Sequence, residues 1–238
     1  MLHFYFEEQI RAAHRLAISP TLYTKKMACA LCLVRRPKRF CPGVRGDICT
    51  ICCGTEREVT VVCPLDCEYL QDARRHDKPV PLKGVPLPSE DIRISEKFLQ
   101  DHEELLLFLG HSLSGAALET PGVADFEVRE ALGALVRTYR TLQSGVYYET
   151  RPGNVPANVL FGKVQTALAE FRTQEQQRLG MPKTRDSDVL GMLVFFERLE
   201  LDRNNGRRRG RAFIDFLGSL YPGSRVAAGN ASSPLVLP

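Results

Sequence analysis

The sequence predicts a mainly α-helical protein with a small cysteine-rich module near its N-terminal end. Two observations lead to this fold class. All eight cysteines of the 238-residue chain fall between Cys29 and Cys67. Beyond about residue 95, apolar residues recur with the period of an α-helix. A hydrophobic content of 44% and a charged content of 25% are typical of a folded globular domain.

Shifts in composition divide the chain into five segments. Residues 1–26 form an N-terminal extension, either upstream of a true start at Met27 or carrying a docking helix over 4–18. The cysteine-rich module spans 27–79, and a proline-rich linker spans 80–94. A helical domain follows over 95–221, and the tail 222–238 has the composition of a disordered segment.

The helical domain is expected to hold about five helices. The first begins at Ser95, a residue type that caps helix N-termini. The next three cover about 125–144, 156–179 and 187–201, and a short last helix covers 211–221. Gly145 and Gly180 stand where a left-handed residue ends a helix. The fourth helix is apolar nearly all round, which predicts a central position.

The spacing of the cysteines favours metal binding over disulfides. The runs CALC and CTIC place two thiols in one tight turn, as in zinc knuckles. An even number of cysteines also allows a disulfide framework, which a reducing compartment disfavours. We expect two Zn²⁺ ions, each held by four of the eight thiolates: Cys29, Cys32, Cys41, Cys49, Cys52, Cys53, Cys63 and Cys67.

The pairing of thiols with ions has two solutions, because neighbouring Cys52 and Cys53 should serve different ions. A cross-braced solution joins Cys29, Cys32, Cys49 and Cys52, and leaves Cys41, Cys53, Cys63 and Cys67 for the second ion. The other joins Cys29, Cys32, Cys41 and Cys53, and leaves Cys49, Cys52, Cys63 and Cys67. Interlocked clamps favour the cross-brace, because the module is small and has little core.

The end of the module is predicted to form a strand followed by a helix. Glu58–Val62 alternates and is rich in β-branched residues, and a helix starts near Pro64 with Cys63 and Cys67 on one face. A knuckle, a strand and a ligand-bearing helix start resemble treble-clef and cross-brace zinc modules, such as HIT and MYND fingers. The resemblance covers residues 29–76 and implies a zinc-stapled fold. The closing His and Cys pair of those families is missing, unless His76 substitutes.

Two basic clusters are candidate nucleic-acid contacts. One surrounds the first cysteines and the other precedes the last helix: Arg35, Arg36, Lys38, Arg39, Arg45, Arg203, Arg207, Arg208, Arg209 and Arg211. Two Zn²⁺ ions with eight thiolates would cancel the formal charge of +4, so local patches matter more than net charge. Cations beside a zinc–thiolate cluster also stabilise its sulfurs. Arginines before a helix N-terminus suggest a carboxylate or anion partner.

No enzyme is evident in the sequence. The histidines are scattered and no P-loop, dinucleotide or serine-elbow motif occurs. Tyr147 and Tyr148, in the loop Ser144–Asn154, either plug the end of the helical bundle or form a binding site. No apolar run approaches membrane-spanning length.

These features predict a cytoplasmic, bacterial, non-catalytic zinc protein that recognises nucleic acid, with no small-molecule substrate. The alternatives are a protein–protein adaptor that binds an acidic surface, and a thiol redox switch.

Overall fold

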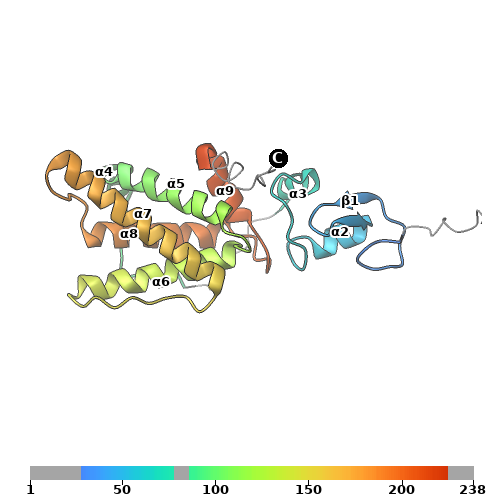
Figure 1. Cartoon of the computed structure of the whole chain (residues 1–238), viewed down its shortest axis with the longest axis horizontal. Helices are drawn as coiled ribbons and strands as arrows, with labels where there is room; N and C mark the ends of the chain where they lie inside the picture. The colour runs from blue at the N-terminus through green and yellow to red at the C-terminus, as the bar shows by residue number, and fades with distance from the viewer. Residues whose placement is uncertain (1–27, 78–85, 225–238) are drawn as a thin grey trace, which may run out of the picture. The chain divides into compact units, whose positions relative to one another are not determined.

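A computed structural model describes residues 28–77 and 86–224 (Figure 1). The chain divides into two compact units, Met1–Glu56 and Arg57–Pro238. Cys63 and Cys67 therefore belong to the second unit, apart from the other six cysteines. The expected N-terminal extension, the segment 78–85 of the module and linker, and the tail from 225 onward lie outside the described residues.

The first unit contains the β element of the protein. Strand β1 (Arg39–Cys41) pairs antiparallel with β2 (Gly46–Ile48), and Phe40 stands opposite Asp47. Helix α2 (Thr50–Glu56) follows directly. Ile48 is fully buried and packs with three buried cysteines in a core that belongs to this unit alone. Because so little apolar surface is available, a core of this size needs a further staple.

The expected strand at Glu58–Val62 does not form. Arg57 and Val61 make an isolated bridge around a turn. Glu58 adopts a left-handed backbone with φ of 54°, and its side chain is buried. Alternating β-branched residues predicted a strand here. The Glu58 carboxylate is instead buried against partners within the unit, and this burial favours a turn.

The expected helix start at Pro64 is also displaced. Helix α3 covers Glu68–Arg74, with Cys67 as its N-cap residue. Cys63 and Cys67 therefore do not share one helical face.

The second unit is mainly helical, as predicted. After α3 its helices are α4 (Glu96–Asp101), α5 (Glu103–Glu119), α6 (Asp125–Gln143), α7 (Val155–Leu179), α8 (Asp186–Arg203) and α9 (Ala212–Leu220). The first expected helix is split into α4 and α5 at His102, whose φ of −120° is not helical. The other four helices lie within a few residues of their expected bounds.

Helix α8 is central in this unit, which confirms the prediction from its apolar composition. Helix α6 packs along α7 and α8, and α5 packs against α7 and α9 (Figure 1). Val189, Leu193 and Phe196 of α8 are buried in the shared core.

Three of the expected caps are present. The Ser95 hydroxyl accepts a hydrogen bond from the Phe98 N–H, and Gly145 and Gly180 have φ near 80°. Ser224, at the end of the described residues, is buried and its hydroxyl lies 2.8 Å from that of Ser114.

Candidate functional site

Four thiols come together in the first unit. The Sγ atoms of Cys29, Cys32, Cys49 and Cys52 all lie within 4.8 Å of one another, and all four are free thiols. Among the described residues this is the one group of its kind. Three of the four side chains are buried, and that of Cys32 is half-buried. This group could hold a metal ion.

Local backbone structure places the two knuckles. The Leu33 N–H donates to the Cys29 carbonyl, and Leu33 takes a left-handed φ of 55° that closes the first turn. Cys49 follows β2 directly, and Cys52 lies in the first turn of α2. The Ala30 N–H donates to the carbonyl of Asp47 in β2, so the strand pair holds both knuckles at one point.

Backbone N–H groups point at the sulfur atoms. The Cys49 N–H donates to Cys29 Sγ at 3.2 Å, and the Cys52 N–H donates to Cys49 Sγ at 3.4 Å. The Arg35 N–H donates to Cys32 Sγ at 3.5 Å. Hydrogen bonds of this kind stabilise a thiolate more than a thiol. The local fold is therefore suited to hold these four sulfurs in the charged form that binds metal.

The pKa values within the group diverge. Burial raises the pKa of Cys29, but backbone hydrogen bonds from Cys32, Cys49 and Leu31 outweigh it and lower the pKa to about 6. Burial and hydrogen bonds with neighbouring thiols raise the pKa of Cys52 to about 12. Negative charge on one sulfur thus disfavours charge on the next. A bound cation removes this conflict, because it attracts all four thiolates.

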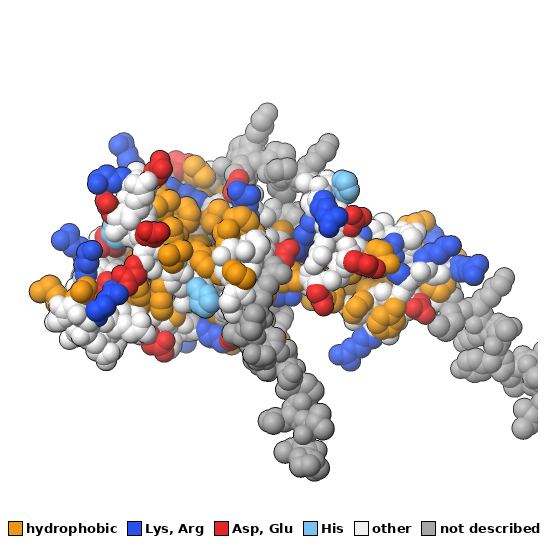
Figure 2. Space-filling model, turned by 90° about the horizontal axis from the view of Figure 1, so that it is seen from above, with side chains coloured by type: hydrophobic (Ala, Val, Ile, Leu, Met, Phe, Trp, Pro, Cys, Tyr) orange, Lys and Arg blue, Asp and Glu red, His pale blue; other side chains and the backbone are white. Residues whose placement is uncertain are grey.

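The basic residues of the first unit play two roles. The pKa of Arg35 is raised because its side chain hydrogen-bonds Cys49 and lies near the charges of Cys32 and Cys52. Arg35 therefore stabilises the thiolates of the four-cysteine group. Arg36, Lys38 and Arg45 are exposed, and Arg39 is half-buried. Basic and hydrophobic side chains lie close together on the visible face of this unit (Figure 2).

The group of four matches one of the two expected pairings. Cys29, Cys32, Cys49 and Cys52 are the thiols that the cross-braced solution assigns to one ion. Of the remaining cysteines, Cys41 lies on β1 and Cys53 on α2. Cys63 and Cys67 lie in the second unit. A second four-thiolate ion stays a prediction.

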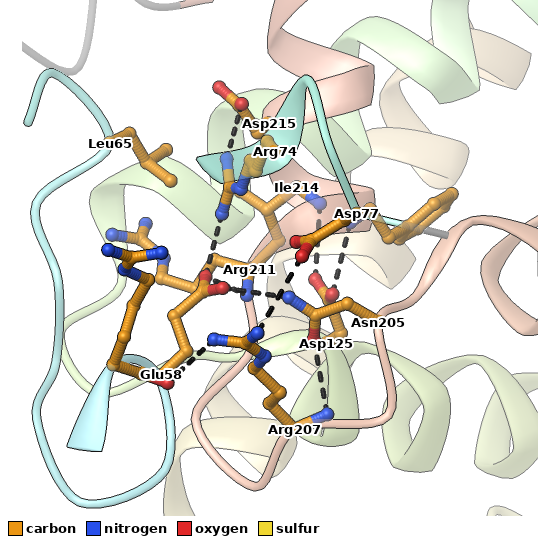
Figure 3. Close-up of polar contacts among 12 residues, drawn as sticks. Glu58, Leu65, Arg74, Asp77, Asp125, Asn205, Arg207, Arg211, Ile214 and Asp215 are labelled. Carbon is orange, nitrogen blue, oxygen red and sulfur yellow. Dashed lines mark hydrogen bonds and ion pairs between the residues drawn. The ribbon is translucent and has the colours of Figure 1, made fainter. Parts of the chain in front are cut away.

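The second basic cluster is organised by Glu58 (Figure 3). The side chain of Glu58 is 1% exposed, and its carboxylate accepts from the Arg74 guanidinium at 2.7 Å. It also accepts from the Asn205 side-chain amide at 2.7 Å and from the Arg211 N–H at 3.1 Å. The Glu58 carbonyl accepts from the Arg209 N–H at 2.8 Å. A buried acid from the turn at 58–60 thus holds the whole loop in place, as the charge on that loop suggested.

The arginine side chains of this loop have different surroundings. The Arg203 guanidinium lies over the Phe216 ring, 4.7 Å from its centre. Arg207 donates to the Arg57 carbonyl at 3.0 Å and pairs with Asp77 at 3.6 Å. Both are therefore engaged within the unit. The other three are either exposed or half-buried: Arg208, Arg209 and Arg211.

Asp125 supports the same region from α6. Its carboxylate accepts from the N–H groups of Phe213 and Ile214, at 3.0 and 3.2 Å, in the first turn of α9 (Figure 3). Burial raises the pKa of Asp125 to about 7, although the two N–H donors oppose the rise. The N-terminus of α9 is thus satisfied by an internal acid, and it offers these two donors to no outside ligand.

Sequence reasoning missed Glu58, Arg74 and Asp125 as organising residues. The available signal was the run of positive charge at residues 203–211, but it did not show which carboxylate would pair with these arginines. The plug expected of Tyr147 and Tyr148 is wrong, because both rings are 65% exposed. The Tyr147 hydroxyl instead donates to Glu149 at 2.9 Å.

Comparison with known proteins gives no identification. A search against protein-family models, curated proteins and solved structures finds no match to this chain. Within the part of the chain that the structure describes, no helix combines the length and apolar character needed to cross a membrane.

Proposed function

We propose that this is a non-catalytic zinc-binding protein that binds nucleic acid through its first unit. Four thiolates are soft ligands, which suit zinc better than magnesium or calcium. Zinc–sulfur bonds of about 2.3 Å set tetrahedral sulfurs about 3.8 Å apart, which fits a group gathered within 4.8 Å. Four protein ligands close the coordination shell, so the ion has a structural role.

One observation carries the nucleic-acid part of the proposal. Phe40 lies on β1, next to Lys38 and Arg39, and its ring is 61% exposed. Asp47 of β2 stands opposite Phe40 in the strand pair. An exposed aromatic ring beside cations is the surface that proteins use to stack on the bases of a single strand while neutralising its phosphates. A metal ion bound by Cys49, which directly follows β2, would fix one end of this hairpin.

The remaining basic residues contribute unequally. Arg36 and Arg45 are exposed on the first unit and add positive charge near Phe40 in the sequence. Arg35 is engaged with the sulfurs. In the second unit, Arg203 and Arg207 are engaged internally. The proposal therefore rests on the hairpin of the first unit and not on the arginine loop.

Binding of the metal-loaded protein to a labelled single-stranded oligonucleotide, followed by fluorescence anisotropy over a range of salt, tests the proposal. Phe40→Ala should weaken binding by about 1–3 kcal/mol through lost stacking. Lys38→Gln should reduce the salt slope by about 0.7, as expected for one lost phosphate contact. Matched controls in the second unit are Phe126→Ala and Arg178→Gln, which remove an exposed ring and an exposed cation. Equal binding by wild type and Phe40→Ala would refute the stacking role.

A second candidate function, a protein adaptor, is favoured by a different observation. Leu33 and Val34 are 75% and 83% exposed beside the first knuckle, and Ile51 is also exposed on α2. Large exposed apolar side chains on a small rigid unit are typical of protein interfaces. Such binding would depend weakly on salt and would be lost in Val34→Ser, whereas nucleic-acid binding would weaken steeply with salt.

A further inference from the structure

The arginine loop, residues 203–211, contributes three arginines to a cavity whose lining holds a single acid. The cavity has a volume of about 330 Å³ and lies wholly within the second unit. The loop Arg208–Arg211 forms one wall, and the connection between α5 and α6 forms the other. A volume of this order accommodates a small ligand.

Three arginines line this cavity, namely Arg208, Arg209 and Arg211. None of them forms a hydrogen bond or ion pair with the described residues through its side chain. Arg211 is the most telling, because its Nε is buried and lacks a hydrogen-bond partner within the described ranges. Burial lowers the pKa of Arg211, and the charge of Arg74 adds to the fall, although the nearby charges of Asp125, Glu58 and Asp215 oppose it.

The one acid in the lining does not compensate for this charge. The carboxylate of Glu127 is occupied by two donors, the Ala124 N–H at 2.9 Å and the Asn154 side chain at 3.0 Å. Within the lining itself three cations face one anion, and behind the lining the carboxylates of Asp125, Glu58 and Asp215 act on Arg211 alone. A phosphate monoester carries about −1.5 to −2 at neutral pH, which suits a lining with more cations than acids.

Apart from Thr120, whose hydroxyl donates to the Ala116 carbonyl at 2.7 Å, the rest of the lining is apolar. Val62, Leu118, Pro121 and Val123 face the same space. A ligand here would therefore set its anionic group against the arginines and a hydrophobic body against these side chains. Arginine suits a phosphate group because its planar fork donates two parallel hydrogen bonds to two oxygens.

The neighbouring cavity shows what a compensated site looks like. It has a volume of about 490 Å³ and is lined by Arg129, Arg207 and Arg208 together with acids. Arg129 is bound by the buried carboxylate of Glu200 at 2.7 Å, and Arg207 is paired with Asp77. Arg129 and Arg207 therefore need no ligand, whereas Arg208 lines both cavities and has no such side-chain partner among the described residues.

We propose that the cavity lined by Arg208, Arg209 and Arg211 binds a small molecule that joins a phosphate monoester to an apolar body. This site is separate from the hairpin of the first unit. Its ligand is a phosphorylated small molecule, whereas the sequence suggested only a carboxylate or anion partner for these arginines.

Phenyl phosphate is a suitable probe, because it carries both groups. Its binding to the full-length, metal-loaded protein is measured by isothermal titration calorimetry, with inorganic phosphate and benzoate as the two partial probes. We expect phenyl phosphate to bind saturably and at least about tenfold more tightly than either partial probe, a difference of about 1.4 kcal/mol. No saturable binding, or equal binding of inorganic phosphate, would overturn the proposal.

Variants locate the site. Arg208→Gln combined with Arg209→Gln changes two exposed side chains, so folding should be kept while phenyl phosphate binds at least about tenfold more weakly. Arg178→Gln on α7 is the matched control and should bind as wild type does. Unchanged binding by the double variant would show that the cavity is not the site. Phe40→Ala should leave this binding intact, so failure here is distinct from failure of the nucleic-acid proposal.

Discussion

The carboxylate of Glu58 and the guanidinium of Arg74 form an ion pair at 2.7 Å in which the acid is almost completely buried. Arg74 also binds Asp215 on α9, so it joins the turn at 58–60 to the last helix (Figure 3). Glu58 in turn fixes the loop of Asn205 and Arg211. A pair of charges far apart in sequence therefore sets the position of the arginine loop.

Replacing Glu58 with glutamine should destabilise the second unit by about 3 kcal/mol, because Arg74 would keep its buried charge and lose its main counter-ion. Urea unfolding of the full-length protein measures the change. It is followed by far-UV circular dichroism, because the chain has no tryptophan for fluorescence. Glu170→Gln, an exposed acid on α7, is the control and should have no measurable effect. A loss for Glu58→Gln no larger than that of the control would mean that the pair contributes no stability.

Stability should depend on pH through Asp125. Burial raises the pKa of this side chain from 3.8 to about 7 in the folded protein. The folded state therefore keeps a proton that the unfolded chain has released between these values. The contribution of Asp125 to stability is full below about pH 4 and is lost as the pH rises through about 7.

Asp125→Asn removes this titration, so the free energy of unfolding of wild type relative to the variant should fall from about pH 4 to about pH 8. Urea unfolding at a series of pH values measures the difference. A difference that grows with pH would show that the two N–H donors keep the carboxylate ionised and outweigh the effect of burial.

Removing the metal should unfold the first unit and spare the second. The first unit has a small core around Ile48 and its cysteines, whereas the second has an extensive core of its own. Metal binding is then the main source of folding free energy in the first unit. In NMR spectra, a chelator should collapse the dispersed amide signals of residues 28–56 and leave those of 95–220 in place. Loss of both sets together would indicate that the units fold as one.

Cys49→Ser should have the same effect as the chelator, because it removes one of four ligands. Ser219→Ala in the second unit is a control that removes a hydroxyl from an exposed position on α9. It should leave the spectrum of the first unit unchanged.

The periodicity of the sequence predicted most of the second unit, because helices α6, α7 and α8 present long apolar faces, and α6 and α7 end at glycines. The break at His102 was missed, since the apolar pattern runs through it without interruption. Cysteine spacing likewise predicted which four thiols of the first unit come together, because each short Cys-x2-Cys turn fixes the separation of its two sulfurs.

Long-range polar contacts were beyond the reach of the sequence. Glu58 lies among β-branched residues and looked like the exposed face of a strand, but its partners Asn205 and Arg211 are about 150 positions away in the chain. Tyr147 and Tyr148 were expected to plug the end of the bundle. Thr138 and Thr141 instead hold the backbone of their loop, and the side chains stay exposed.

The metal centre is tested most directly by X-ray absorption spectroscopy at the zinc edge on the purified full-length protein. We predict a sulfur shell at about 2.3 Å with no nitrogen or oxygen neighbour in the first shell. Substituting Cys29 or Cys49 with serine should remove about one equivalent of zinc per chain or open its sulfur shell. A protein that binds no zinc, or binds it through nitrogen and oxygen only, would contradict the assignment of Cys29, Cys32, Cys49 and Cys52 as a zinc site.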